Sequence, residues 1–243
     1  MQGLLRRERS ILGTGVAPCA PGANAPGGLH CAMRIDFVSD VACPWCAVGL
    51  NSLESALRSI GDAIPVELHF EPFELNPAMP PEGEDAVRYL SRKYGAPPEQ
   101  LARNRAALRE RGAAVGFEFG ERPWIWNTFD AHRLLHWAGL EGLDRQRALK
   151  HALLTAYHGR AENPGARDVL LRLAGEVGLD VERARAVLDS DEFAAEVRER
   201  ERYWQELGIH SVPAVVIDGR HLISGGQPPE VFEQALRQIA AGS

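Results

Sequence analysis

The pattern of apolar and polar positions changes period twice along the chain. Residues 34–39 (RIDFVS) form a short run rich in Ile, Phe and Val, and residues 66–70 alternate between apolar and polar side chains. Both patterns are typical of β-strands. Between them, apolar residues recur with helical spacing from Val48 to Ile60, and Gly61 follows. This stretch therefore predicts a β-α-β unit.

The middle of the chain, residues 76–207, carries almost no strand signal and repeats a helical pattern instead. Apolar residues recur at i, i+3 and i+4, and glycines close several of the runs. We expect helices over residues 84–94, 98–115, 128–138, 149–157, 170–177 and 193–207. The Arg/Glu-rich run 196–202 (EVRERER) is interpreted as the solvated face of a helix.

Strand signals return after Gly208. Residues 214–217 and 221–224 read as two strands joined by a hairpin turn at Asp218-Gly219, and residues 231–240 carry the apolar stripe of a last helix. Neither end of the chain is large enough to close a core alone. We therefore expect an α/β fold in which the β-α-β and β-β-α halves share one sheet, with the helical block as an insertion.

The first 32 residues differ from the rest. They hold no aromatic residue, and residues 13–28 are rich in Gly, Pro and Ala and carry no charge. Such a segment buries too little apolar surface to offset its backbone entropy, so we expect a disordered tail. No apolar run of signal-peptide length follows the basic start. We therefore expect a cytoplasmic protein, and translation from Met33 is a reasonable hypothesis.

Composition narrows the functional classes. The net charge is −6 at pH 7, which argues against a general nucleic-acid-binding surface. There is no apolar run of 18 residues, so no membrane span is expected. Four cysteines in 243 residues are too few for a disulfide-stapled scaffold, so the cysteines matter by their placement.

The strongest chemical signal is Cys43-Pro44-Trp45-Cys46, between the first predicted strand and the first predicted helix. A helix N-terminus offers free N–H groups and the positive end of the helix dipole, and both favour a thiolate. Pro44 fits the first helical position without losing a hydrogen bond. The i, i+3 spacing puts both sulfurs on one side of the first turn, with Cys43 exposed and Cys46 further in. We therefore expect Cys43 to attack a disulfide and Cys46 to resolve it.

Two other interpretations of the cysteine pair follow from the residues. The cysteines can be small buried apolar residues, or His30 and Cys31 can complete a Cys3His zinc site with them. The C-P-W-C motif is too specific for cysteines that only fill a core. The zinc site lacks support, because the sequence has no second C-x-x-C. We therefore expect no metal, and we interpret Cys19 and Cys31 as incidental to the tail.

Four stretches in order resemble the DsbA-like branch of the thioredoxin fold, and within it the FrnE-type subgroup. They are FVSDVACPWC, FELNPAMPPEGEDAVRYLSRKYG, NTFDAHRLLHWA and SVPAVVIDGRHLISGGQPPEVF, and the resemblance covers residues 34 to about 240. It implies a thioredoxin-like domain made of residues 33–75 and 208–243, with residues 76–207 as a helical insertion domain. It also implies disulfide exchange with protein, peptide or small-molecule thiols, by a monomer or a homodimer.

The resemblance implies further site residues. Val212-Pro213 stands where thioredoxin-like proteins hold a cis-proline loop beside the cysteines, and Pro44 and Trp45 would shape the substrate surface. Trp45 lacks the charged or hydrogen-bonding partner that a histidine supplies, so we expect a less oxidising pair than a histidine there would give. His132, on a helix over the site, is a candidate for binding substrate or thiol, and a structural polar residue is the alternative.

The related 2-hydroxychromene-2-carboxylate isomerases have the same architecture and use glutathione. As the resemblance has it, they carry a serine at the position of Cys43, so a cysteine pair favours dithiol chemistry and leaves glutathione as a reductant or co-substrate. A glutathione-dependent isomerase is therefore the alternative function, and a non-enzymatic binding module is a third. Asp36, on the first strand, is an acid near the cysteines whose orientation the alternation does not decide.

Overall fold

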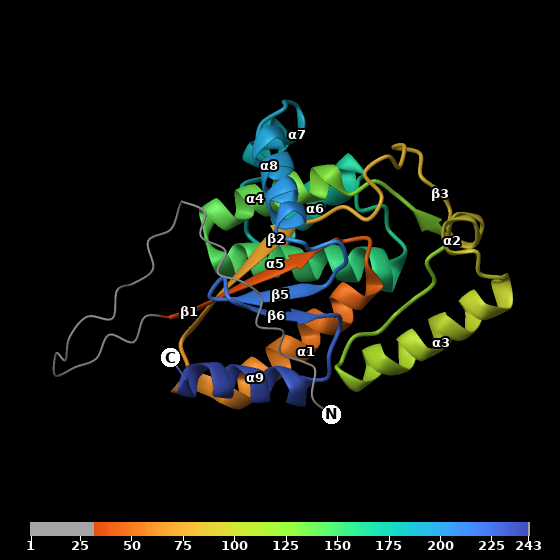
Figure 1. The fold of residues 1–243 in the computed structure, drawn as a ribbon. Coiled ribbons are helices and arrows are strands. Elements are labelled where there is room, and N and C mark those ends of the chain that lie inside the picture. Colours follow the sequence, from red (N-terminus) through yellow and green to blue (C-terminus); the bar gives the residue numbers. More distant parts are fainter. Residues whose placement is uncertain (1–31, 243) are drawn as a thin grey trace.

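The computed structural model describes residues 32–242, and a four-stranded mixed sheet lies at its centre (Figure 1). The strands are β1 (Met33–Ser39), β2 (Val66–Pro72), β5 (Ala214–Ile217) and β6 (His221–Ser224), in the spatial order β2-β1-β5-β6. β1 pairs in parallel with β2 and antiparallel with β5, and β5 pairs antiparallel with β6. The two ends of the chain therefore build one sheet, as the sequence predicts.

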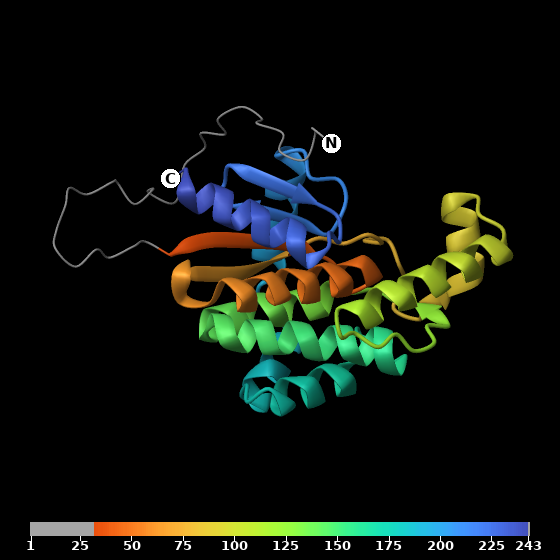
Figure 2. The same ribbon diagram turned by 90° about the horizontal axis from the view of Figure 1, so that it is seen from below.

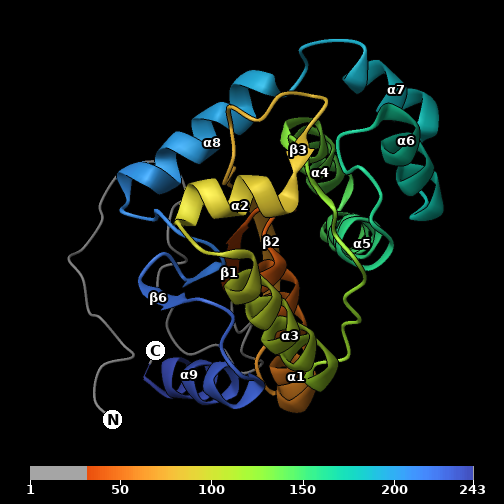
Figure 3. The ribbon, with the colours of Figure 1, turned by 90° about the vertical axis from the view of Figure 1, so that its right-hand side faces the viewer.

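Helices cover both faces of this sheet (Figure 3). Helices α1 (Pro44–Ile60) and α9 (Pro229–Ala241) pack on one face, where Ile35 and Phe37 of β1 are completely buried. On the other face Val38 packs with Trp204 of α8 (Ala194–Glu206). β1 thus buries Ile35 and Phe37 on one face and Val38 on the other, while Arg34 and Asp36 pair with each other at 2.6 Å.

The segment between the halves is mainly helical. It contains α2 (Ala86–Tyr94), α3 (Pro98–Ala114), α4 (Phe129–Glu141), α5 (Leu143–Leu154), α6 (Arg167–Glu176), α7 (Val181–Leu188) and α8, with a π-helical turn at Thr155–Gly159 after α5. A 3-10 turn, Gly61–Ala63, ends α1. Two features were not expected: α7, and a ladder of two short strands, β3 (Glu84–Asp85) and β4 (Trp124–Ile125). Two-residue strands are too short to leave an alternating pattern, and α7 is only eight residues long.

Helices α4 and α5 lie along β2, the edge strand of the sheet (Figure 1). The side-chain amide of Gln146 imitates the next strand. Its Oε1 accepts a hydrogen bond from the Phe70 N–H, and its Nε2 donates to the Phe70 carbonyl, both at 3.1 Å. Gln146 thereby satisfies the N–H and carbonyl of Phe70 at the sheet edge, as a neighbouring strand would.

A second core lies within the insertion, where α4 to α7 pack together as a helical layer (Figure 2). Val41 and Ala42, which precede the cysteines, are buried in this same core. The insertion is therefore in direct contact with the loop that carries the cysteine motif. One expectation for this region was wrong in part: within the Arg/Glu-rich run, Glu201 is only 5 % exposed and is paired with Arg198.

The predicted disordered tail, with His30, Cys19 and Cys31, lies outside the described residues except for Ala32. In the part of the chain that is described, no helix has both the length and the apolar composition needed to cross a bilayer.

Candidate active site

The cysteine motif lies at the junction of β1 and α1, where the chain turns from the sheet into the helix. Cys43 is the N-cap of α1 with extended backbone angles, φ −88° and ψ 113°, and Pro44 is the first helical residue. The Cys46 N–H donates to the Cys43 carbonyl at 3.0 Å. Cys43 therefore lies at the N-terminal end of α1, where the helix dipole and the backbone N–H groups of the first turn favour a thiolate.

The two sulfurs differ in access in the expected order, although both are buried. Cys43 is 4 % exposed and Cys46 is fully buried, while Trp45 between them is 41 % exposed. The expectation of an exposed Cys43 was therefore too strong. Carbonyls and neighbouring loops cover most of it, and Trp45 supplies the exposed surface of the motif.

A cis peptide bond joins Val212 and Pro213, at the position that the resemblance implied. The Cys43 thiol donates to the Val212 carbonyl across 3.5 Å, so this loop lies directly beside the first cysteine. Gly49 of α1 makes the approach possible, because a Cβ there would lie 3.0 Å from Pro213 Cγ. Gly226 likewise allows its segment to lie close to Trp45, because a Cβ on Gly226 would lie 3.1 Å from the Trp45 carbonyl oxygen.

The surroundings shift the pKa values of the two thiols in opposite directions. A hydrogen bond from the Cys46 thiol lowers the pKa of Cys43, and the backbone N–H groups of Cys46 and Trp45 act in the same direction against burial. Burial raises the pKa of Cys46 well above its usual value, and the neighbouring Cys43 adds to this. Cys43 is therefore the thiol that ionises first, and Cys46 keeps its proton longer.

Asp40, three residues before Cys43, is fully buried and joins the site to the insertion. Its Oδ1 accepts from the Thr128 hydroxyl at 2.8 Å and from the Ala42 N–H at 3.0 Å, and its Oδ2 accepts from the Leu75 N–H at 2.7 Å. His132 Nε2 lies 3.4 Å from Oδ1. Burial alone would raise the pKa of Asp40, but His132, together with the N–H groups of Leu75 and Ala42, outweighs burial and lowers the pKa.

Two buried basic residues of the insertion lie behind the cysteine loop. Lys150 of α5 is 1 % exposed, and burial lowers its pKa while the charges of Cys46 and Asp40 oppose the shift. His158 Nε2 lies 2.8 Å from the Val41 carbonyl, and burial lowers the pKa of His158 to about 3. At neutral pH this imidazole is uncharged and donates its Nε2–H to Val41.

The structure thus brings Cys43, Cys46, Val212 and Pro213 together as expected, and places His132 one layer behind them. His132 is only 2 % exposed and contacts Asp40 rather than open surface. Asp36 is turned away, because it pairs with Arg34 at 2.6 Å.

The sequence analysis missed Asp40, Lys150 and His158. Asp40 carried a usable signal, since an Asp that accepts from the N–H two residues on is typical of a turn before a helix. Lys150 and His158 had no such signal in the sequence, because the packing of the insertion decides whether they are buried. Among residues 32–242, no cluster of three or more His, Cys, Asp or Glu side chains is placed to hold a metal ion.

Comparison with known proteins agrees with this geometry. The family model of the DSBA-like thioredoxin domain matches residues 34–237. A structure of a probable DsbA oxidoreductase from Streptomyces coelicolor is 36 % identical, with a TM-score of 0.80, and covers 87 % of this chain and 91 % of that one. The protein YwbO of Bacillus subtilis (strain 168) is 27 % identical over 207 residues, which are 84 % of this chain and 96 % of that protein.

More distant structures share the fold. The cytosolic disulfide reductase DsbM from Pseudomonas aeruginosa, solved with GSH, is 19 % identical over 86 % of this chain and 99 % of that one, with a TM-score of 0.59. A 2-hydroxychromene-2-carboxylate isomerase is 15 % identical over the same shares, with a TM-score of 0.65. The motif at a strand–helix junction, the cis-proline loop beside it and the match over residues 34–237 lead to one conclusion: this chain belongs to the family of DSBA-like thioredoxin domains.

Proposed function

We propose that this protein is a thiol–disulfide oxidoreductase in which Cys43 attacks and Cys46 resolves. The observation that carries the proposal is the opposite shift of the two thiol pKa values at one helix N-terminus. A nucleophile needs a populated thiolate, whereas a resolving thiol must stay protonated until the mixed disulfide has formed. An isomerase that only uses glutathione has no need of Cys46.

In the reducing direction, the Cys43 thiolate attacks one sulfur of a substrate disulfide and the other sulfur leaves as a thiolate. The Cys46 thiol then loses its proton and attacks Cys43 Sγ, which releases the second substrate sulfur. The substrate gains two electrons and two protons, and the protein ends with a Cys43–Cys46 disulfide. The oxidising direction is the same sequence in reverse.

We propose that Trp45 and the Val212-Pro213 loop bind the substrate chain next to Cys43, with Pro44 holding the turn between the cysteines. The support is that Trp45 is the exposed part of the motif and that the Val212 carbonyl already contacts the Cys43 thiol. His132 is buried against Asp40, so we assign it a supporting position in the loop rather than direct contact with substrate.

We further propose that glutathione is the reductant that recycles the Cys43–Cys46 pair. We also propose that the protein acts in the cytoplasm and belongs to the FrnE-like subgroup. Protein or peptide thiols are the proposed partners, and the working unit is a monomer or a homodimer. The glutathione proposal is supported by the fold it shares with a disulfide reductase that was solved with GSH. The motif stretches quoted above support the subgroup.

The decisive experiment is a redox titration in glutathione buffers, with the thiol state read by alkylation and mass. We expect a reversible two-electron transition that disappears in Cys46→Ser, together with a trapped Cys43–glutathione mixed disulfide in that variant. The midpoint decides whether the protein reduces or oxidises in its compartment. If no intramolecular disulfide forms at any poise, the proposal fails and the glutathione-dependent isomerase takes its place.

A further inference from the structure

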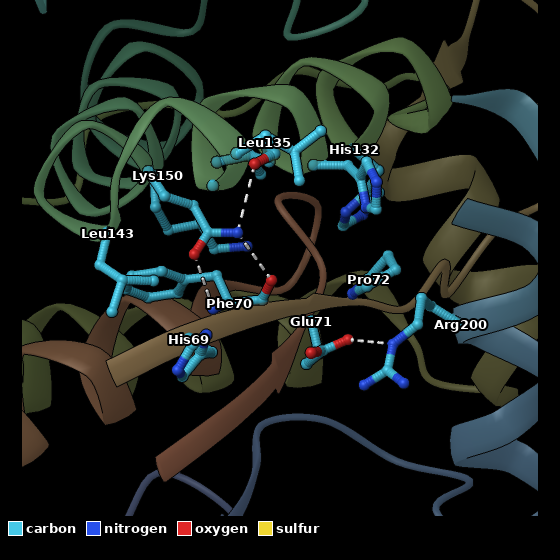
Figure 4. Close-up of a pocket in the computed structure, with 13 residues that line it drawn as sticks. His69, Phe70, Glu71, Pro72, His132, Leu135, Leu143, Lys150 and Arg200 are labelled. Atoms are coloured by element: carbon cyan, nitrogen blue, oxygen red, sulfur yellow. Dashed lines mark hydrogen bonds and ion pairs between the residues drawn. The ribbon is translucent and has the colours of Figure 1, made fainter. Parts of the chain in front are cut away.

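A cavity of about 200 Å³ lies between strand β2 and the helices α4, α5 and α8 (Figure 4). Five basic residues line it, namely His69, His132, His136, Lys150 and Arg200, and Glu71 is the one acid among its lining residues. The remaining lining residues are mainly apolar and include Leu135 and Leu143. The cavity is therefore partly apolar, and its titratable side chains are mainly basic types.

The charges in this cavity are not balanced. Glu71 is engaged, because it accepts hydrogen bonds from Arg200 Nε at 2.8 Å and from Trp204 Nε1 at 3.1 Å (Figure 4). Lys150 is 1 % exposed, and within residues 32–242 it has neither an ion pair nor a side-chain hydrogen bond. Asp40, the nearby acid, already accepts from four other groups. A buried ammonium without a partner is costly, so an anion that reached Lys150 would be favoured.

The choice of lysine at this position is informative. Only Lys93 and Lys150 among the 27 lysine and arginine residues of the chain are lysines, and the rest are arginines. Lys93 is exposed, so Lys150 is the buried one. A compact ammonium fits a small cavity where a guanidinium fork does not, and it leaves room for a ligand beside it.

We propose that this cavity binds a small monocarboxylate with a compact apolar body, the carboxylate on Lys150 Nζ and the body against Leu135 and Leu143. The size supports this class, because a cavity of about 150 Å³ is known to hold benzene, and about 200 Å³ adds room for a carboxylate. Larger anions such as nucleotides do not fit. A neutral ligand would leave the charge of Lys150 uncompensated.

Occupancy of the cavity has a consequence for the thiols, and this consequence rests on the proposed function. The charge of Lys150 lowers the pKa of Cys46. A carboxylate bound to Lys150 offsets that charge, so Cys46 gives up its proton less readily and resolves the mixed disulfide more slowly. The ligand would thus act as an inhibitor of disulfide exchange from outside the substrate surface.

The binding test uses the full chain with lysine labelled by carbon-13 at Cε, which gives two NMR signals. Cyclohexanecarboxylate is the probe, and cyclohexylmethanol is its neutral counterpart. We expect the carboxylate to shift the Lys150 signal saturably and to leave Lys93 unchanged. Lys150→Met should weaken binding by about tenfold or more, while the matched Lys93→Met should not.

Leu143→Trp offers a second variant, since Leu143 is half-buried at the cavity and the larger side chain should block the ligand without emptying the core. The proposal is overturned if the Lys150 signal does not saturate, if cyclohexylmethanol binds as well as the carboxylate, or if Lys150→Met binds normally. Inorganic phosphate that binds more tightly than the probe would also overturn it. Cys46→Ser should still bind the probe, so a failed disulfide assay and a failed binding site are told apart.

Discussion

Asp40 Oδ1 lies 3.4 Å from His132 Nε2, and this contact joins the end of the first strand to helix α4 of the insertion. The same carboxylate accepts from Leu75, Ala42 and Thr128. One buried acid therefore holds three separate segments around the cysteine loop. The cysteine loop is therefore held by the insertion as well as by the sheet.

Asp40→Asn should destabilise the protein by about 2–4 kcal/mol at neutral pH, because an amide presents its NH2 to at least one of the donors that the carboxylate accepts. The pKa of Asp40 is lowered in the folded state, so its contribution is complete above about pH 5 and is lost as the pH falls through the folded value. Urea unfolding from pH 7 to 3 measures both effects. Exposed Asp62→Asn is the control, and equal stability of the two variants would contradict the role.

His158 should cause a separate loss of stability on acidification, and this loss should begin at a higher pH than the loss caused by Asp40. Its folded pKa is about 3, against about 6.5 in the unfolded chain, so the unfolded state binds more protons between these values. Stability therefore falls as the pH drops, by about 3 kcal/mol between pH 6.5 and 4. His158→Gln, whose amide also donates to Val41, should remove this component. An unchanged slope in that variant, with exposed His210→Gln as reference, would be the opposing result.

Trp45→His should make the cysteine pair more oxidising. An imidazole between the cysteines can donate a hydrogen bond to the Cys43 thiolate or carry a charge beside it, and indole provides no charge. Stabilising the thiolate stabilises the reduced protein, and about 30 mV corresponds to 1.4 kcal/mol for two electrons. The expected upward shift is tens of millivolts, measured by alkylation in glutathione buffers. Trp45→Phe controls for loss of the indole, and identical potentials in both variants would refute the argument.

Gln146→Leu should cost about 2–4 kcal/mol, because it leaves the buried N–H and carbonyl of Phe70 without partners at the sheet edge. Thermal and urea unfolding measure this loss. Gln100→Leu, at an exposed position of α3, should change stability by less than about 0.5 kcal/mol. A similar small effect at Gln146 would show that water replaces its amide without cost.

The order of the longer elements and the position of the cysteine motif follow from the sequence alone. Long helices and alternating strands leave periodic patterns, and the cysteine motif is local, so both are readable without a structure. α7 and the β3–β4 ladder were not predicted because they are short. The residues of the cis-proline loop were named from the resemblance, since no local pattern places residue 212 beside residue 43.

The surroundings of the two sulfurs follow from the tertiary fold, and no local pattern in the sequence predicts them. Asp40, Lys150 and His158 come from three separate elements, and their side chains are polar types that usually lie on the surface. Their burial follows from the packing of the insertion against the cysteine loop, which brings together residues more than 100 positions apart. Polarity along a sequence reports preference for water, whereas the pKa of a thiol depends on which charges the fold places near it.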